Sequence, residues 1–309
     1  MKRILWLTPV AVLIGCGGGG GGGGGSGNGG GAIPTVPFTS WSDVRPNTEI
    51  VAPAISTEAN YTANSAETTT DVGDFTGYTG IEFRETFGAD GAITKASVTT
   101  GDGDRLVFDT AQGALFGPIA NGFATAAVNS ELTEIAIAVE PVAQGWNYQT
   151  FGVWSRDPAG GKPGRVGAIS AGNFTATNNI PSTGSATFTG AAAGLYVAPD
   201  GVAGGIVAAD MAMVVDFSSR VAGFATANTT LSPDGIQPSR AFPTLDLTGS
   251  LQVANGQNLM FGTVSTTSSG LTGDINGKFY GPNAQEVGGT FGLKGAGVES
   301  FVGGFGGKR

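Results

Sequence analysis

The stretch LTGDINGKFYGPNAQEVGGTF, residues 271–291, decides the fold of this chain. In its first half, apolar or small residues stand at every second position and alternate with Thr, Asp, Asn and Lys. These positions are Leu271, Gly273, Ile275, Gly277 and Phe279. A period of two is typical of a β-strand with one buried face. The turn signal at residues 281–283 separates this strand from a second run. The stretch therefore predicts an antiparallel hairpin with Phe279 in a core.

The same alternation recurs throughout residues 148–309. It is clearest at 211–217 and 245–253, and shorter runs lie at 148–154, 185–190, 221–226, 259–265, 287–293 and 300–305. Evenly spaced strands separated by turn signals predict a β-sandwich or an up-and-down barrel. Frequent strand glycines favour the barrel, because closing a sheet requires strong bending. We predict an all-β protein whose C-terminal domain is an antiparallel up-and-down barrel of about eight strands, filled by its Leu, Met, Phe and Ile side chains.

Residues 41–147 carry weaker signals of the same kind. Residues 81–87 alternate between apolar and polar side chains, which fits a half-buried strand. The pairs Asp90-Gly91 and Asp102-Gly103 are hairpin signals, and strands are expected at 92–100 and 105–109. Residues 131–139 fit either a strand or a short helix, and periodicity leaves both open. We expect a smaller β-rich domain here.

Composition excludes several classes of function. The chain has no histidine, which excludes Ser-His-Asp and Cys-His catalysis and any His-ligated metal site. The chain has 15 Lys and Arg residues and 24 Asp and Glu residues, which gives a net charge of −9. This negative charge disfavours binding to the phosphate backbone of a nucleic acid. We therefore predict that the protein is not an enzyme, needs no cofactor and does not bind nucleic acid.

The N-terminus carries an export signal. Lys2 and Arg3 precede an apolar run at residues 4–14, which is too short to span a membrane but typical of a signal peptide. Cys16, the single cysteine, follows a Leu and a Gly at the lipobox spacing and resembles the lipidation site of bacterial lipoproteins. This resemblance implies that residues 1–15 are removed and that Cys16 carries the acyl chains, palmitate among them, which anchor the protein to a membrane. The alternative is an ordinary signal peptide that leaves a free thiol.

Residues 16–40 are rich in glycine and form a flexible tether in this interpretation. The predicted order is thus a signal peptide at 1–15, a tether at 16–40, the smaller β-rich domain at 41–147 and the barrel at 148–309.

The sequence GKFYGPNAQEVGGTF, residues 277–291, resembles the closing motif of transferrin-binding protein B-like lipoprotein barrels, a family that includes the factor H-binding lipoproteins. Residues 147–154 resemble the first strand of such barrels, and residues 181–190 resemble the next one. The resemblance implies that residues 41–147 are the "handle" domain that precedes the barrel in this family.

The resemblance also implies a function. It predicts an outer-membrane lipoprotein on the cell surface, a monomer, that binds a host or environmental protein of the iron-source or complement-regulator class. A single barrel motif is present, so the length excludes a complete two-lobed receptor. The alternatives are a small-ligand carrier, for a solute or haem, and a structural envelope protein facing the periplasm. The ligand-binding residues are not predicted.

Three local features have structural explanations. Residues 101–104 resemble a calcium loop, but an EF-hand would need Gly and an acid at positions now held by Val107 and Gly113, so a hairpin turn is expected. Trp146, Phe151 and Trp154 could form a binding patch, but aromatic residues of a small barrel usually belong to its core, where we expect them. Glu286 is expected to accept hydrogen bonds from turn amides at the end of the barrel.

Overall fold

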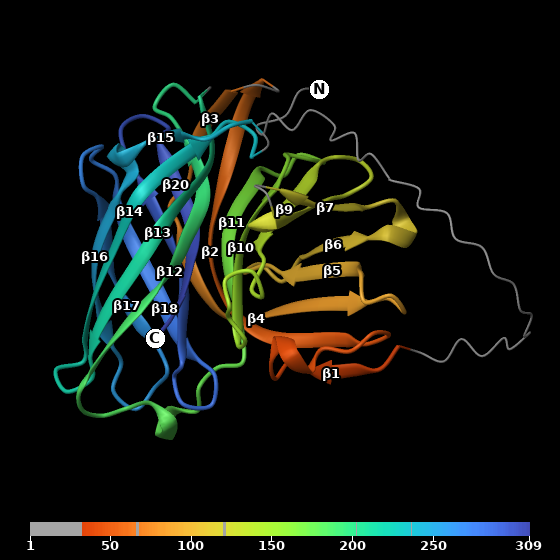
Figure 1. The fold of residues 1–309 in the computed structure, drawn as a ribbon. Helices are drawn as coiled ribbons and strands as arrows, with labels where there is room; N and C mark the ends of the chain where they lie inside the picture. The colour runs from red at the N-terminus through yellow and green to blue at the C-terminus, as the bar shows by residue number, and fades with distance from the viewer. Residues whose placement is uncertain (1–32, 66–67, 120–121, 202, 236) are drawn as a thin grey trace, which may run out of the picture.

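The computed structural model describes residues 33–65, 68–119, 122–201, 203–235 and 237–309. The predicted signal peptide, the predicted lipidation site Cys16 and residues 17–32 lie outside the described residues. The described chain is built from β-strands and a few short 3-10 helices, as predicted. Within these ranges, no helix combines the length and hydropathy that crossing a membrane requires. The strands form two sheets that pack side by side (Figure 1).

The first sheet, called the handle sheet below, curls into a nearly closed barrel. Its strand order is β6-β5-β4-β2-β11-β10-β9-β8-β7, with β1 and β3 also paired to β2. The strands are β1 (Thr35–Pro37), β2 (Glu49–Ser65), β3 (Thr68–Val72), β4 (Thr76–Phe87), β5 (Ile93–Thr99), β6 (Arg105–Asp109), β7 (Leu115–Ile119), β8 (Ala124–Val128), β9 (Glu134–Val139), β10 (Gln149–Arg156) and β11 (Gly164–Gly172). The ambiguous run at 131–139 is thus a strand, β9.

The second sheet closes completely and is called the barrel. Eight strands follow one another around the ring in chain order, and the pairing of β13 with β14 is part of the ring. The eight are β12 (Ser185–Val197), β13 (Gly204–Asp216), β14 (Val221–Ser232), β16 (Leu247–Val253), β17 (Met260–Thr266), β18 (Thr272–Tyr280), β19 (Glu286–Lys294) and β20 (Ser300–Lys308). The short β15 (Arg240–Ala241) pairs with β14 outside the ring. The predicted up-and-down barrel of about eight strands is confirmed.

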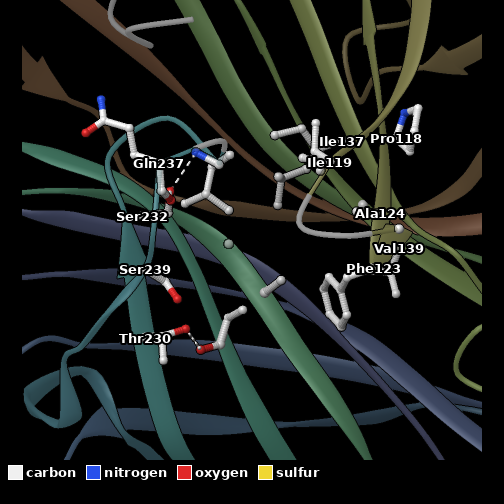
Figure 2. Close-up of a pocket in the computed structure, with 18 of the residues that line it drawn as sticks. Pro118, Ile119, Phe123, Ala124, Ile137, Val139, Thr230, Ser232, Gln237 and Ser239 are labelled. Atoms are coloured by element: carbon white, nitrogen blue, oxygen red, sulfur yellow. Dashed lines mark hydrogen bonds between the residues drawn. The ribbon is translucent and has the colours of Figure 1, made fainter.

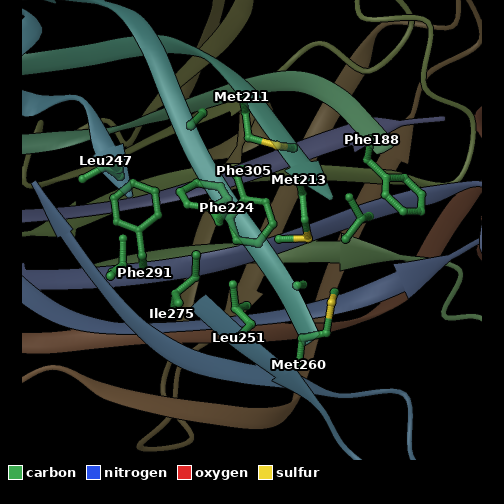
Figure 3. Packing of buried hydrophobic residues seen from close by; sticks show 14 of the residues in the cluster. Phe188, Met211, Met213, Phe224, Leu247, Leu251, Met260, Ile275, Phe291 and Phe305 are labelled. Carbon is green, nitrogen blue, oxygen red and sulfur yellow. The ribbon is translucent and has the colours of Figure 1, made fainter. Parts of the chain in front are cut away.

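The barrel interior is filled with apolar side chains, as the alternation predicts. Phe188, Phe224, Phe291 and Phe305 converge on three methionines of β13 and β17 (Figure 3). Close approach of the strands depends on glycine at β19, where a Cβ on Gly289 would lie 2.0 Å from the carbonyl oxygen of Asn276. Burial of this cluster stabilises the domain, since each large apolar side chain contributes about 1.5–3 kcal/mol.

The sheet boundary differs from the sequence prediction. Strands β10 and β11 pair with each other, with β9 and with β2, so they belong to the handle sheet and not to the barrel. The change of sheet falls between Gly172 and Ser185. The reason is that β10 is buried on both faces: Trp154 packs in the handle core, and Phe151 and Val153 pack toward the barrel. Because β10 is buried on both faces, its sequence does not indicate which of the two sheets it joins.

The two domains meet along a polar seam between β2, β10 and β11 on one side and β18 to β20 on the other. The hydroxyls of Thr57 and Thr290 lie 2.8 Å apart across it. The side chain of Gln149 is fully buried and packs against the backbone of β19 and β20 at Gly288 and Gly306, where a Cβ would collide with its amide. The Gly-rich ends of β19 and β20 therefore accommodate the handle as well as the barrel.

An apolar cleft between the handle and the barrel

A cleft of about 930 Å³ opens where β7 to β10 of the handle face β12 to β14 of the barrel. Figure 2 shows its two walls, with the handle residues on one side and the segment from Thr230 to Ser239 on the other. We call this space the inter-domain cleft. It lies outside the barrel core and outside the handle core.

The handle wall consists of aliphatic and aromatic side chains. Side chains of β9 alternate, so Ile137 and Val139 point to the cleft while Ala136 and Ala138 point into the handle. Phe123, half-buried just before β8, projects between the walls. The neighbouring strand β10 contributes Phe151 and Val153 in the same way. This wall is therefore an apolar surface built by four adjacent strands, β7 to β10.

The barrel wall is more polar, but the side chains of Thr230, Ser232 and Gln237 already form hydrogen bonds within the barrel domain. Ile206 and Ala208 of β13 point outward to the cleft, whereas Val207 between them is buried in the barrel. The Ser232 hydroxyl donates to the carbonyl oxygen of Gln237 at 2.9 Å and accepts the backbone N–H of Gly235 at 2.9 Å. These hydrogen bonds tie Ser232 to the residues that follow β14. They leave few free hydrogen-bond donors and acceptors in the cleft.

The chemistry of the cleft is that of an apolar binding surface. Its described lining carries no ionisable side chain. Nowhere in the described ranges do three or more acidic, Cys or His side chains gather as a metal site would require. Covering such a surface is favourable by about 25 cal/mol for each Å² of apolar area removed from water. The arrangement can bind an apolar group but offers no general acid, base or nucleophile.

The residues singled out from the sequence have the following positions. Glu286, at the start of β19, accepts the backbone N–H groups of Asn147 at 2.6 Å and Tyr148 at 3.0 Å, so the amides come from the linker before β10. Burial raises the pKa of this carboxyl, while the two backbone amides act in the opposite direction. Trp146, Phe151 and Trp154 are buried, as predicted for core residues.

The calcium-like segment is a turn, as predicted. Gly103 has a positive φ of 85°, and the carboxyl of Asp102 pairs with the guanidinium of Arg165. The neighbouring Asp104 pairs with Arg156 at 3.2 Å. Both carboxylates thus neutralise arginines of the handle sheet.

Sequence reasoning did not find the inter-domain cleft. Its walls come mainly from strands β7 to β10 and β12 to β14, which lie far apart in the sequence. The wall residues on these strands occupy the outward face of strands that are otherwise typical, so only the partner across the cleft distinguishes them. The apolar outward side chain at Ile206 is the one local signal.

Comparisons with known proteins agree with the fold. Residues 180–309 match the family model for the C-lobe and N-lobe beta barrels of Tf-binding protein B. The resemblance drawn from the closing motif is confirmed for this part of the chain, and the fold is transferrin-binding-protein-like. A search of curated proteins gives no match.

Several solved structures are similar. A mutant transferrin binding protein B from Haemophilus parasuis Hp5 is 16% identical, with 75% of this chain and 54% of that one covered and a TM-score of 0.40. Transferrin binding protein B from serogroup B Neisseria meningitidis is 13% identical, with coverages of 89% and 78% and a TM-score of 0.40. The N-lobe domain of lactoferrin binding protein B from Moraxella bovis is 11% identical, with coverages of 82% and 98% and a TM-score of 0.38. This chain spans about half the length of the Haemophilus protein.

Proposed function

We propose that this chain is a surface lipoprotein of the outer membrane that binds a protein ligand. The lipobox-like residues before Cys16 support a lipid anchor, and the glycine-rich segment after it supports a tether that holds the folded domains away from the membrane. The match of residues 180–309 to the barrels of Tf-binding protein B supports ligand binding over catalysis.

The observation that carries the proposal is the inter-domain cleft. The barrel interior is occupied by side chains, so a ligand is bound on the outside. The cleft has a volume of about 930 Å³, and its described lining is largely apolar and uncharged. Protein partners commonly anchor an aromatic or aliphatic side chain in such a depression and surround it with weaker contacts.

The proposed ligand class is a host or environmental iron-carrier protein. The similar structures are those of transferrin binding and lactoferrin binding proteins, which supports this class for the present chain. A complement regulator is the second class to be examined.

The experiment compares matched variants on one strand. Lipidated full-length protein is captured on a sensor, and transferrin, lactoferrin and a complement regulator are passed over it. Ala208→Arg places a charged side chain in the cleft, and Ala212→Arg places the same side chain on an exposed outward position of β13 beyond the lining. We expect Ala208→Arg to weaken binding by about tenfold or more, since burying an unpaired charge is unfavourable. Ala212→Arg serves as the control and should bind normally.

Two results would argue against the proposal. Equal affinity of both arginine variants would separate the cleft from binding, and protection of the protein from protease added to intact cells would favour the periplasmic structural alternative. The volume of the cleft also supports a second candidate, a small apolar ligand, because ligand pockets span about 300–1,000 Å³. Recovery of a small molecule from the purified wild type, but not from Ala208→Arg, would support that candidate.

A further inference from the structure

A carboxyl group occupies a core position of the handle. Ile81, Phe83, Glu85 and Phe87 follow one another on the same face of β4, and the three apolar members belong to the handle core. Glu85 is itself 8% exposed. Its partners on the neighbouring strands are Ile50 and Ala96, which offer no polar side chain. The position is therefore one that packing alone would fill with an apolar residue.

Glu85 differs from the other buried carboxyls in having no hydrogen-bond donor among the described residues. The equally buried Glu58 receives the Ser56 hydroxyl, the Gly101 N–H and the Arg165 guanidinium at 2.7, 2.9 and 2.6 Å. A buried carboxyl without such partners costs free energy. Its presence at this position points to a role other than stabilising the fold.

Glu85 lines a cavity of about 240 Å³ inside the handle, called the handle cavity. This volume corresponds to roughly eight water molecules at about 30 Å³ each. Val142 also lines it and is 74% exposed, which places the mouth of the cavity at the segment between β9 and β10. The carboxyl is thus reachable from solvent by a small molecule.

The remaining lining pairs a second carboxyl with aromatic rings. Glu140 reaches the same cavity and accepts a hydrogen bond from the Thr125 hydroxyl. Aromatic side chains on four elements surround the two carboxyls, namely Trp41, Phe83, Phe87, Phe108 and Phe116. No basic side chain is found in the described lining.

This combination selects for an organic cation. Carboxylates attract the positive charge, and the faces of aromatic rings bind ammonium groups and their alkyl substituents. A metal site is not indicated, because no three acidic, Cys or His side chains gather here or elsewhere among the described residues. We propose that the handle cavity binds a small organic ammonium ion between Glu85 and Glu140.

Binding of the cation is coupled to release of a proton. Burial, together with the negative charge of Glu140, raises the pKa of Glu85 to about 8. Glu140, which directly follows β9, is the other ionisable group in the described lining, and its charge acts on Glu85. At neutral pH Glu85 therefore holds a proton in the empty cavity, and the ammonium ion replaces it. One positive charge enters as one leaves, so the charge of the cavity is unchanged.

Isothermal titration of the full chain tests this with choline, tetramethylammonium and 3,3-dimethylbutanol, the neutral isostere of choline. We expect both cations to bind and the alcohol to bind at least about tenfold more weakly. Affinity for choline should rise about tenfold for each unit by which the pH is raised toward the pKa of Glu85, and it should level off above that pKa. Titrations in two buffers of different ionisation enthalpy should show release of about one proton.

Three variants complete the test. Glu85→Gln should abolish proton release and the pH dependence, and Glu140→Gln should weaken choline binding at every pH. Glu82→Gln is the matched control, because Glu82 lies on the opposite face of β4 and pairs with Arg84. The proposal is overturned if neither cation binds at millimolar concentration, if the alcohol binds as well as choline, or if Glu85→Gln behaves like Glu82→Gln.

Discussion

The hydroxyl groups of Tyr280 and Ser170 lie 2.7 Å apart and join the last residue of barrel strand β18 to handle strand β11. Both residues are fully buried. Tyr280 follows Phe279 in the closing motif, and Phe279 points into the barrel. Phe279 therefore packs in the barrel core, while the next residue, Tyr280, forms a contact at the seam between the domains. The motif specifies how the two domains are joined as well as how the barrel closes.

Tyr280→Phe should destabilise the protein by about 1–3 kcal/mol, because it leaves the Ser170 hydroxyl buried without its partner. Urea unfolding of the variant and the wild type measures the difference. Tyr78→Phe removes the hydroxyl of a half-buried Tyr on β4 and is the control, with an expected change within about 0.5 kcal/mol. Equal stability of Tyr280→Phe and the wild type would show that the hydroxyl contact at the seam contributes nothing.

Replacing each of two barrel glycines by alanine should change the stability of the protein in opposite directions. A Cβ on Gly289 would lie 2.0 Å from the Asn276 carbonyl oxygen and 2.5 Å from the ring of Phe305, so Gly289→Ala should cost about 1–3 kcal/mol or more. A Cβ on Gly223 meets no atom within 4 Å, and Gly223→Ala should be neutral or stabilise by up to about 1 kcal/mol. Thermal unfolding of both variants measures this, and a similar melting temperature for the two would contradict it.

The alternation of apolar residues was sufficient to predict the barrel, because five of its eight strands, β13, β14 and β16 to β18, have one buried face and one more exposed face. Leu247, Leu251 and Val253 are buried and the residues between them are exposed or half-buried, as the pattern requires. The same reasoning failed for β10, where both faces are buried and periodicity carries no information about the partner sheet.

The candidate sites were beyond sequence reasoning for a different reason. The handle cavity depends on Glu85 and Glu140 meeting across the handle, 55 positions apart in the chain. The apolar neighbours of Glu85 at positions 83 and 87 are a local sign that it faces inward, but alternation alone cannot show whether a buried carboxyl has a partner.

The ion pair between Arg165 and Glu58 should contribute strongly to stability. The two side chains are 11% and 1% exposed, and their charged atoms lie 2.6 Å apart. Arg165→Met should cost about 3–5 kcal/mol, because it leaves the Glu58 carboxylate buried and incompletely paired. Adding Glu58→Gln should recover part of this loss. Lys294→Met, at the exposed pair with Asp74, should cost less than about 1 kcal/mol. Chemical denaturation measures all three, and similar losses for Arg165→Met and Lys294→Met would contradict the prediction.

The stability of the protein should fall with rising pH because of Glu85. Its pKa is about 8 in the folded chain and about 4.5 as its ordinary value. Between these values the folded chain holds a proton that the unfolded chain has released, so raising the pH favours unfolding. Below the lower value both states hold the proton, and above the upper value both have lost it. The slope reaches at most about 1.4 kcal/mol for each pH unit.

Glu85→Gln removes this titration, so its free energy of unfolding relative to the wild type should increase steadily from about pH 5 to about pH 8. Urea unfolding at several pH values measures the difference. Other carboxyls with raised pKa, such as Glu58 and Glu286, titrate in both proteins and cancel in the comparison. Parallel stability curves for the variant and the wild type would mean that Glu85 titrates alike in the folded and unfolded chains, and hence that the handle cavity is well solvated.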